Sequence, residues 1–582
     1  MARSARSTGA QAAPSPHGLA RVLPILSWLP AYHRAWLRPD LIAGLAVAAL
    51  VVPKSLGYAG IAGVPLQYGL YAAAAGALIY ALFGTSRQIA TGPSSALAAV
   101  AAGAVLGAGA SGDDAVRLVA SITLVTGVLF VALAVFKMGW ISQFLSKAVI
   151  TGFLFGAGVQ VAISELAGIT GTTADGDNSW ETLSSWLGGL GDTDTTTLAV
   201  GLVSLAVVFG LRFAAPRVPG ALVLVVGGLA ASAALDLADR GVAVVGDVPA
   251  GLPSVVLPDV GFMVDNSTVI LTAAVALLLI GFSQTAGDAR EFASRHRYQV
   301  DINQESLAQG MSNLGTGLVQ GIPVSASLSS SSLNDQSGAK SPLASLTTGS
   351  LVVLTLLFLA PVFSDLPKPV LSALIIEAVV MGMMDVAGMR RLYRVKRSDF
   401  WIAMAALLGV LGAGVMAGVV IGIVLSMVWM VYVSAVPAMP VLGLQPGTRV
   451  FRSVQTFPDG RTYPGVLVLS FDAGLFFIDA DALQDRIRQE AHDASPPLTL
   501  VVVDFEGVNY IDSQGSDAVA RVSDLAQAHG AELRLARVKP AILEVLTADG
   551  VVDRLGERGV SGTVYDAVAD RVATPDRGGD TR

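Results

Sequence analysis

The chain has 582 residues, of which 53% are hydrophobic and only 14% are charged, and its formal net charge is −7. Soluble domains carry roughly 25% charged residues, so we expect most of this chain to lie in a lipid bilayer. The acidic balance gives no support for nucleic-acid binding. The chain has no cysteine, which excludes disulfides and thiolate catalysis, and its five histidines show no metal-ligand spacing. We therefore expect neither a metal nor a cofactor.

Residues 1–38 are expected to form a cytoplasmic tail followed by a pre-membrane segment. Met1–Gly18 is polar and lacks an apolar core before a cleavage site, so we interpret it as a disordered tail and not as a signal peptide. Arg34 and Arg38 precede the first apolar stretch, and by the positive-inside rule they favour a cytoplasmic N-terminus.

Residues 39–436 are predicted to form a transmembrane transport domain. A bilayer span needs roughly 20 apolar residues, and some of the stretches here are shorter. The predicted spans are 41–60, 66–84, 92–109, 115–136, 145–168, 196–212, 219–237, 267–287, 304–320, 328–339, 343–363, 367–384, 399–414 and 415–435.

Charged residues between these spans indicate the sidedness of the loops. The acidic loop 175–194 is expected to face outside. Two basic loops are expected to be cytoplasmic. They contain Arg290, Arg295 and Arg297 in the first, and Arg390, Arg391, Arg394, Lys396 and Arg397 in the second.

Two Gly/Pro/Ser breaks interrupt the apolar sequence. The first is Thr91–Ser95, and the second is Gly321–Ser325, which runs into a serine cluster. Irregular backbone at membrane depth is tolerated only where it is buried in protein or lines a wet cavity, and paired breaks point to a transport site. Because each break precedes a possible helix start, with free N–H groups and a positive dipole end, the pair favours an anion as ligand.

The two halves of this region also echo each other. Leu145–Ile150 (LSKAVI) resembles Leu366–Leu371 (LPKPVL), and each leads into an apolar helix after one of the breaks. A weak internal repeat with paired broken helices is typical of inverted-topology transporters.

The pattern changes at residue 437 to that of a soluble α/β domain over 437–572, followed by a disordered tail over 573–582. Short buried strands are predicted at 465–469, 498–504 and 532–536, and they alternate with helices at 480–489, 516–529 and 540–548. This alternation predicts a small sheet covered by helices.

Several motifs resemble those of the sulfate permease (SulP) family of anion transporters, in order along nearly the whole chain. The tail sequence Val508–Gly515 (VNYIDSQG) resembles the signature loop of the STAS domain that this family carries at its C-terminus. The matching membrane motifs are Val52–Ala59 (VPKSLGYA), Val64–Tyr71 (VPLQYGLY), Ala81–Arg87 (ALFGTSR) with Gly92-Pro93, Asp301–Glu305 (DINQE) and Ser337–Lys340 (SGAK).

The resemblance implies an α-helical polytopic membrane protein with fourteen segments in two inverted sevens. A core domain (segments 1–4 and 8–11) moves against a gate domain (5–7 and 12–14), and segments 3 and 10 are half-helices that face the anion. Carried over by position, the implied substrate-binding residues are Lys54, Tyr58, Gly92, Pro93, Ser94, Ser95, Gln284, Ser327, Leu328, Ser329 and Ser330.

Three positions depart from the common family pattern. Many relatives have Gln at Lys54, an acidic residue at Gln284 and Arg at Ser330. The exchanges suggest that the site cation has moved to Lys54. Glutamine does not titrate, so Asp288, one helical turn later, becomes the candidate for ion coupling. An intramembrane ionisable residue is a functional hypothesis by default.

The STAS loop contains Asp512 and Ser513 as candidate regulatory residues. In anti-sigma-factor antagonists a serine follows this pair and is phosphorylated, but here that position is Gln514, so this phosphoswitch is expected to be absent. We expect Ser513 to cap the helix that follows. Glu165 and Glu377 belong to gate segments, and we expect structural or interfacial roles for them.

The sequence therefore predicts a transporter and not an enzyme. We expect a secondary active, ion-coupled (proton or sodium) anion transporter of the plasma membrane, with a cytoplasmic STAS domain and a homodimeric assembly. Sulfate is favoured because it is the most frequent substrate in the family, with bicarbonate or a dicarboxylate such as fumarate as alternatives. Two alternatives of another class stay open: a membrane-anchored STAS regulatory scaffold and a channel-like anion conductor.

Overall fold

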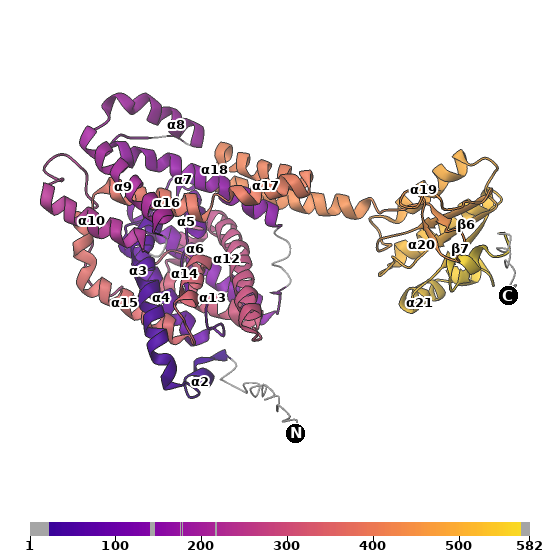
Figure 1. Cartoon of the computed structure of the whole chain (residues 1–582), viewed down its shortest axis with the longest axis horizontal. Helices are drawn as coiled ribbons and strands as arrows, with labels where there is room; N and C mark the ends of the chain where they lie inside the picture. Colours follow the sequence, from indigo (N-terminus) through magenta and orange to yellow (C-terminus); the bar gives the residue numbers. More distant parts are fainter. Residues whose placement is uncertain (1–21, 140–145, 175, 177, 216–217, 572–582) are drawn as a thin grey trace, which may run out of the picture. The chain divides into compact units, whose positions relative to one another are not determined.

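The structure is a computed structural model that describes residues 22–139, 146–174, 176, 178–215 and 218–571. The chain divides into two compact units, Met1–Ser426 and Met427–Arg582 (Figure 1), which are described separately. The predicted tails Met1–Gly18 and 573–582, and Leu145 of the internal repeat, lie outside the described residues.

The first seven segments of the helical unit follow the predicted spans closely. Two short helical elements precede them, α2 (Ile25–Trp28) and η1 (Arg34–Trp36), and the short helices α8 (Ser179–Gly188) and η3 (Gly189–Asp192) lie within the predicted outer loop. The seven segments are α3 (Leu37–Ile61), α4 (Gln67–Phe83), β1 (Thr91–Pro93) with α5 (Ser95–Gly107), α6 (Gly112–Val135), α7 (Lys147–Thr170), α9 (Thr195–Ala214) and α10 (Gly220–Leu235).

The second seven segments repeat this order after the short helix α11 (Val260–Asp265). Lys368 begins α16 as Lys147 begins α7, in agreement with the internal repeat read from the sequence. The segments are α12 (Ser267–His296), α13 (Ile302–Leu318), β2 (Val324–Ala326) with α14 (Leu328–Gln336), α15 (Leu343–Leu354) with η4 (Thr355–Leu359) and η5 (Ala360–Asp365), α16 (Lys368–Gly382) and the two arms of α18 (Arg397–Ala435). The predicted repeat of seven segments is confirmed.

Both predicted basic loops are in fact largely helical. Arg290 and Arg295 belong to α12, which continues past its apolar part because Arg295 pairs with Glu291 at 2.9 Å across one turn. Arg390, Arg391 and Arg394 belong to a short helix, α17 (Val386–Val395), whose N-terminus is capped by the Asp385 side chain. Because these segments carry many charged residues, the sequence analysis predicted loops where the structure has helices.

The predicted spans 399–414 and 415–435 are the two arms of α18. The arms meet at Gly414, whose φ of 83° and ψ of 169° lie outside the helical region. A Cβ atom added at Gly418 would lie 2.2 Å from a Val410 side-chain atom, so the arms pack closely against each other. Among the described residues, eight helices are long and apolar enough to cross a membrane, and α5 is among the shorter apolar helices, as predicted for a half-helix.

Helix packing separates a core from a gate. In the core, α13 packs on α4 and α6, and α15 packs on α3 and α4. In the gate, α16 packs on α7 and α9. The two parts meet where α3 contacts α16 and α5 contacts α7. Within the core, α3 and α4 approach so closely that a Cβ at Gly69 would lie 2.0 Å from the Ser55 carbonyl oxygen.

Two buried carboxylates fasten the ends of the core. The Glu305 carboxylate accepts hydrogen bonds from the Tyr80 hydroxyl at 2.7 Å, from the Thr85 hydroxyl, and from the backbone N–H groups of Thr85 and Ser86 at 2.8 and 3.0 Å. Asp40 accepts from the backbone N–H of Lys340 at 2.6 Å. Such multiply bonded carboxylates tie segments of the two halves together, which explains the motifs DINQE and SGAK in structural terms.

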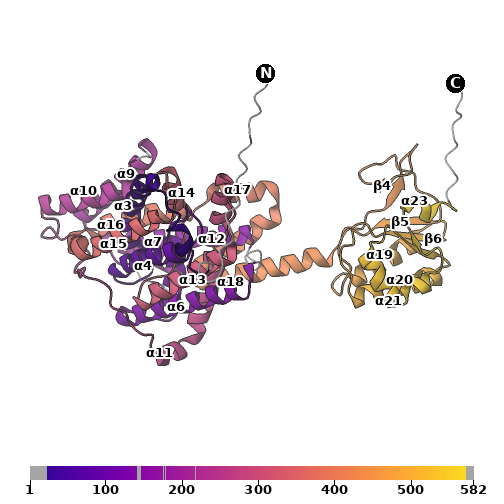
Figure 2. The ribbon, with the colours of Figure 1, turned by 90° about the horizontal axis from the view of Figure 1, so that it is seen from below.

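The second unit is an α/β domain around a parallel sheet ordered β5-β6-β7-β8. One face carries α19, α20, α21 and α22, and the other carries the hairpin β3–β4 with α23 (Figure 2). The elements are β3 (Leu442–Leu444), β4 (Phe451–Ser453), β5 (Val466–Ser470), α19 (Ala480–Asp493), β6 (Leu500–Asp504), α20 (Ser513–Ala528), β7 (Glu532–Ala536), α21 (Pro540–Ala548), α22 (Val551–Leu555), β8 (Val560–Ser561) and α23 (Val564–Val568).

The signature loop of this domain is held by Asp512, not by Ser513. Asp512 is the N-cap of α20 and accepts hydrogen bonds from the N–H of Gly515 at 2.7 Å and of Phe477 at 3.1 Å. Ser513 is the exposed first residue of the helix. The expectation that Ser513 caps the helix is therefore wrong, because the carboxylate one residue earlier occupies that role.

A buried arginine fastens the last helix to the sheet. Arg534 on β7 donates to the Ala567 carbonyl at 2.7 Å and makes a bidentate pair with Asp570 at 2.7 and 2.9 Å. These hydrogen bonds lower the pKa of the Asp570 carboxyl to about 2.

Candidate anion site

The two sequence breaks pair with each other at the centre of the helical unit. Strand β1 runs antiparallel to β2, with Thr91 opposite Ala326, Gly92 opposite Ser325 and Pro93 opposite Val324. All six residues are buried. The pairing satisfies backbone groups that would otherwise lie unbonded at membrane depth, and it relates the two halves by an approximate twofold axis.

A half-helix starts directly after each strand. The Ser94 hydroxyl caps α5 by accepting from the Leu97 N–H at 3.5 Å, whereas Ser327, the N-cap of α14, makes no side-chain capping bond. The N–H groups of a first helical turn have no partner within the helix. Both N-termini thus present a positive dipole end close to the β1–β2 pair, and only that of α14 lacks a side-chain cap.

A small cavity of about 10 Å³ lies beside the β1–β2 pair. Four of the predicted site residues line it: Gly92, Pro93, Ser327 and Ser330. The remaining lining residues are Val47, Val51, Ala77, Ala90, Thr91, Ser345 and Thr348. This volume is close to the least that holds one water molecule, so an anion enters only if the walls move apart.

Gly92 faces open space inside this packed core. An added Cβ atom would meet nothing within 4 Å, although the residue itself is buried. Its φ is not in the left-handed region, so conformational freedom does not explain the glycine. The missing side chain instead lets the backbone approach whatever occupies the cavity.

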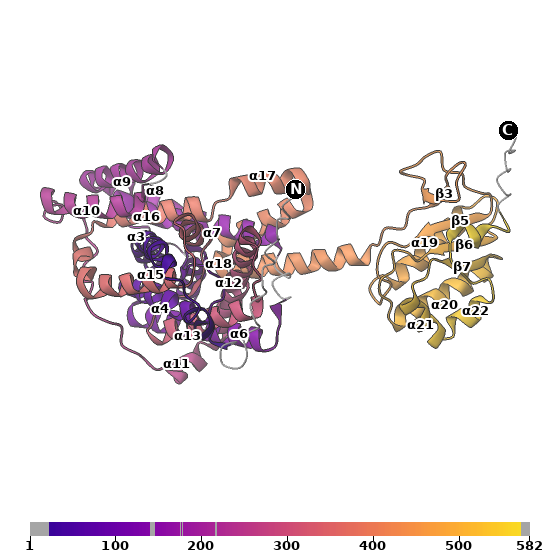
Figure 3. The same cartoon turned by 60° about the horizontal axis from the view of Figure 1, so that its bottom comes forward.

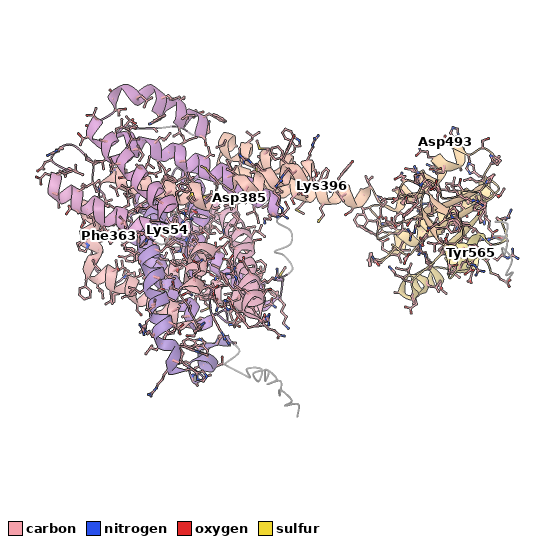
Figure 4. The ribbon with its side chains drawn as sticks, in the orientation of Figure 1. Lys54, Phe363, Asp385, Lys396, Asp493 and Tyr565 are labelled. Atoms are coloured by element: carbon pink, nitrogen blue, oxygen red, sulfur yellow. The ribbon has the colours of Figure 1, made fainter. Side chains whose placement is uncertain are left out.

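Lys54 and Tyr58 lie on the α3 face that lines this cavity at Val47 and Val51, but they are not themselves among its lining residues. Val47, Val51, Lys54 and Tyr58 follow the i, i+4, i+7, i+11 spacing of one helix face. Lys54 is half-buried within the helical unit (Figure 4), and the charges acting on its amine are those of Glu377 on α16 and Arg212 on α9. Glu377 also acts on Tyr58. The lysine therefore stands at the boundary between core and gate.

The two candidates on α12 lie behind β2. The Ser325 hydroxyl donates to the Gln284 side-chain oxygen at 3.1 Å, so Gln284 supports the strand and does not line the cavity. Asp288 follows one turn later, is only 7% exposed, and its Oδ2 has no hydrogen-bond partner within the described part of the chain. A buried carboxyl oxygen without a partner is costly, so Asp288 is held there at a cost to stability.

Comparison with known proteins agrees with this geometry. Residues 37–406 match the model of the sulfate permease family, and residues 458–570 match the STAS domain. The chain belongs to the sulfate permease family.

Its relatives in the sulfate permease family cover nearly the whole chain. A probable sulfate transporter of Mycobacterium tuberculosis (strain H37Rv) is 32% identical over 539 residues, which are 92% of this chain and 96% of that protein. Sulfate transporter 1.1 of Arabidopsis thaliana is 29% identical over 574 residues, 95% of this chain and 88% of that protein. The protein is thus an anion transporter by family, in agreement with the prediction that it is a transporter.

Solved structures share the fold of this protein. The murine Slc26a9 anion transporter in its inward-facing state has a TM-score of 0.86 at 23% identity, covering 97% of this chain and 96% of that one. The transmembrane domain of the cyanobacterial bicarbonate transporter BicA has a TM-score of 0.59 at 21% identity, covering 68% and 98%. The predicted helical membrane fold with a C-terminal STAS domain is confirmed.

Some predicted site residues do not reach the cavity, and other lining residues were missed. Leu328 and Ser329 are exposed, because their positions at the start of α14 turn them away from the lining. Sequence reasoning missed Thr91, whose hydroxyl accepts from Gln309 at 2.9 Å, and Thr348, which lies on α15. The site's polar wall therefore consists mostly of hydroxyl groups from separate segments.

A larger cavity lies between core and gate helices at another place in the helical unit. It measures about 700 Å³ and lies between the C-terminal part of α5, the gate helix α7 and the N-terminal part of α12. Gln160, Ser164, Thr268 and Thr272 give it polar walls. The opposite end of α5 from Gly92 thus faces a polar space between the two domains.

Proposed function

We propose that this protein takes up sulfate by alternating access, as a secondary active transporter driven by an ion gradient. The observation that supports the proposal most directly is the antiparallel pairing of β1 with β2. It holds the N-termini of two half-helices beside one cavity. Sulfate offers four acceptor oxygens and carries no proton at neutral pH, and hydroxyl groups beside this cavity are able to donate to such oxygens.

The chemistry of the site suits a desolvated anion. Backbone N–H groups and the hydroxyls of Ser327, Ser330, Ser345 and Thr348 surround the cavity. Hydrogen bonds to a charged group contribute about 1.5–3 kcal/mol each, net of the water contacts they replace, so a few of them favour a bound anion. The relatives named as sulfate transporters support sulfate over the other anions.

Lys54 supplies the positive charge of the site in this proposal. No arginine or lysine is among the residues that line the cavity in the described structure, and Lys54 is on the lining face of α3. In the absence of an anion the charge of Glu377 balances the lysine. A bound anion takes the place of Glu377 as the negative charge that balances Lys54. Anion binding is thereby linked to the contact between the core helix α3 and the gate helix α16.

Asp288 is the proposed coupling group if protons drive the transport. Its side chain is buried, one oxygen lacks a partner, and it lies on the helix that supports β2. Glu291 is the charged neighbour that acts on it. Protonation and anion binding can therefore influence each other through α12 and β2.

Uptake into proteoliposomes tests the proposal. Radiolabelled sulfate, bicarbonate and fumarate are each supplied with a proton gradient, with a sodium gradient, and with neither. We expect sulfate to accumulate above its equilibrium level with one of the gradients. Preference for bicarbonate or fumarate would show that sulfate is not the main substrate. Downhill flux without accumulation would identify a channel, and absence of flux for every anion would favour a regulatory scaffold.

The proposed setting is the plasma membrane, with the N-terminus and the STAS domain in the cytoplasm and the chain as a homodimer. The positive-inside rule supports this orientation through the basic residues of α12 and α17. Labelling of single cysteines, introduced into a chain that has none of its own, reports the sidedness directly.

A further inference from the structure

The short helix α17 forms one wall of an apolar groove on the gate. Figure 3 shows α17 at the margin of the helical unit, next to α7 and the beginning of α18. Val386, Met389, Arg390, Tyr393 and Arg394 line the groove, and their spacing places them on a single helix face. The face is apolar along its length and carries two guanidinium groups.

The floor of the groove is built from two gate helices. Phe155 of α7, with Met404 and Leu407 of α18, closes a space of about 800 Å³ that is within the usual range for ligand pockets. Tyr393 and Phe400 lie edge to face with ring centroids 5.2 Å apart, and Phe400 continues to Trp401 at 5.4 Å. Such an aromatic cluster is typical of the boundary between the apolar bilayer and the headgroups.

The basic residues beside the groove have no acidic partners. We call Arg390, Arg391, Arg394, Lys396 and Arg397 the α17 cations. In the described part of the chain, no ion pair joins any of them to a carboxylate. Arg397 lies over the Tyr393 ring at 5.7 Å, and Asp385 is engaged as the cap of α17. The cluster therefore presents uncompensated positive charge at the edge of an apolar space.

From these observations we infer that the groove binds an anionic phospholipid of the surrounding bilayer. The acyl chain lies against Phe155, Met404 and Leu407, and the headgroup phosphate is held by Arg390 and Arg394. Guanidinium groups suit this role because they hold phosphate oxygens with two parallel hydrogen bonds. A soluble anion would leave the apolar floor uncovered, and a neutral lipid would leave the two arginines without a partner. In the orientation proposed above, the groove faces the cytoplasmic leaflet, where anionic lipids and basic residues meet.

Lipid binding at this place would act on the gate alone. Every residue that lines the groove belongs to α7, α17 or α18, and none belongs to the half-helices. An occupied groove therefore stabilises the packing of gate helices without contact with the anion site.

Native mass spectrometry of the full-length protein tests the inference. The protein, in a maltoside detergent, is titrated with phosphatidylglycerol or with phosphatidylcholine of the same acyl chains. The groove variant Arg390→Gln/Arg394→Gln is compared with Arg391→Gln/Lys396→Gln, which removes the same charge from exposed positions outside the groove. We expect the groove variant to bind phosphatidylglycerol roughly 30-fold more weakly, since two cations near an anionic headgroup are lost, while the control variant changes little.

Two further measurements distinguish a bound lipid from other occupants of the groove. Met404→Trp fills the apolar floor and should weaken phosphatidylglycerol binding although both arginines remain. Glycerol phosphate, which has the headgroup charge without the chains, should not compete at equal concentration. Equal loss in both arginine variants, undiminished binding in the groove variant, full competition by glycerol phosphate, or a change in dimer mass without a change in lipid number would each overturn the inference. If Met404→Trp fails to fold, the paired arginine variants still decide the question.

Discussion

Replacing Gly92 with alanine should separate the anion site from the stability of the fold. The added methyl group meets no atom within 4 Å, and the backbone is extended there, so the fold accepts it. A Gly to Ala change at a compatible position stabilises a protein by about 0.4–1 kcal/mol through the unfolded state. We therefore expect an unchanged or slightly higher melting temperature for Gly92→Ala.

The same methyl group should weaken anion binding. It projects into a cavity of about 10 Å³ and keeps the anion away from the backbone donors at the β1–β2 pair. Loss of one hydrogen bond to a charged ligand costs about 1.5–3 kcal/mol, which corresponds to a roughly 10- to 150-fold rise in the half-saturating sulfate concentration. Proteoliposome uptake over a range of sulfate concentrations measures this rise.

Two other glycines provide matched controls. Gly210 on α9 also has nothing within 4 Å of an added Cβ, so Gly210→Ala should preserve both stability and transport. Gly69 is the opposite case, because its Cβ would lie 2.0 Å from the Ser55 carbonyl oxygen, and Gly69→Ala should lower the melting temperature. Normal half-saturation in Gly92→Ala, at a normal melting temperature, would refute the placement of the anion beside Gly92.

Three further outcomes are expected. Lys54→Gln should weaken sulfate binding strongly, and Lys54→Gln/Ser330→Arg should restore much of the loss; strictly additive single effects would show that the two positions do not share one charge. Asp288→Asn should abolish proton-driven accumulation while it spares sulfate exchange, and accumulation with an unchanged pH profile would eliminate Asp288 as the coupling group. In the STAS domain, the lowered pKa of Asp570 means that its pairing with Arg534 contributes stability above about pH 4, and this contribution is lost as the pH falls toward 2. After allowance for solvent screening of a side chain that is 35% exposed, the loss is about 1 kcal/mol, and it should vanish in Asp570→Asn during acid unfolding followed by circular dichroism.

The sequence predicted the breaks in the apolar segments but not how they combine. Gly, Pro and Ser at 91–95 and 321–325 signal irregular backbone by local chemistry alone. The strands that form there are only three residues long and lack an alternating pattern, so their pairing depends on tertiary contacts that no local signal contains. Likewise, Lys54 and Glu377 belong to different helices, and only the packing of α3 on α16 brings their charges together.

The surface helix α17 shows a different limitation, because there the sequence analysis predicted a loop where the structure has a helix. Arginines at 390, 391 and 394 favoured a loop in a reading based on hydropathy, yet Val386, Met389 and Tyr393 keep helical spacing between them. A test for amphipathic periodicity at the end of each span would have detected α17.

The pairing of β1 with β2 also determines the order in which the protein can be completed. The ribosome delivers Thr91–Pro93 long before Val324–Ala326, and until the second strand arrives the first has backbone groups without partners inside the bilayer. Neither half can pair the backbone groups of its own strand, so the anion site forms only when the later half of the chain has been inserted. Two fragments divided between α10 and α11 should therefore bind no anion separately and regain binding when they are made together in one membrane.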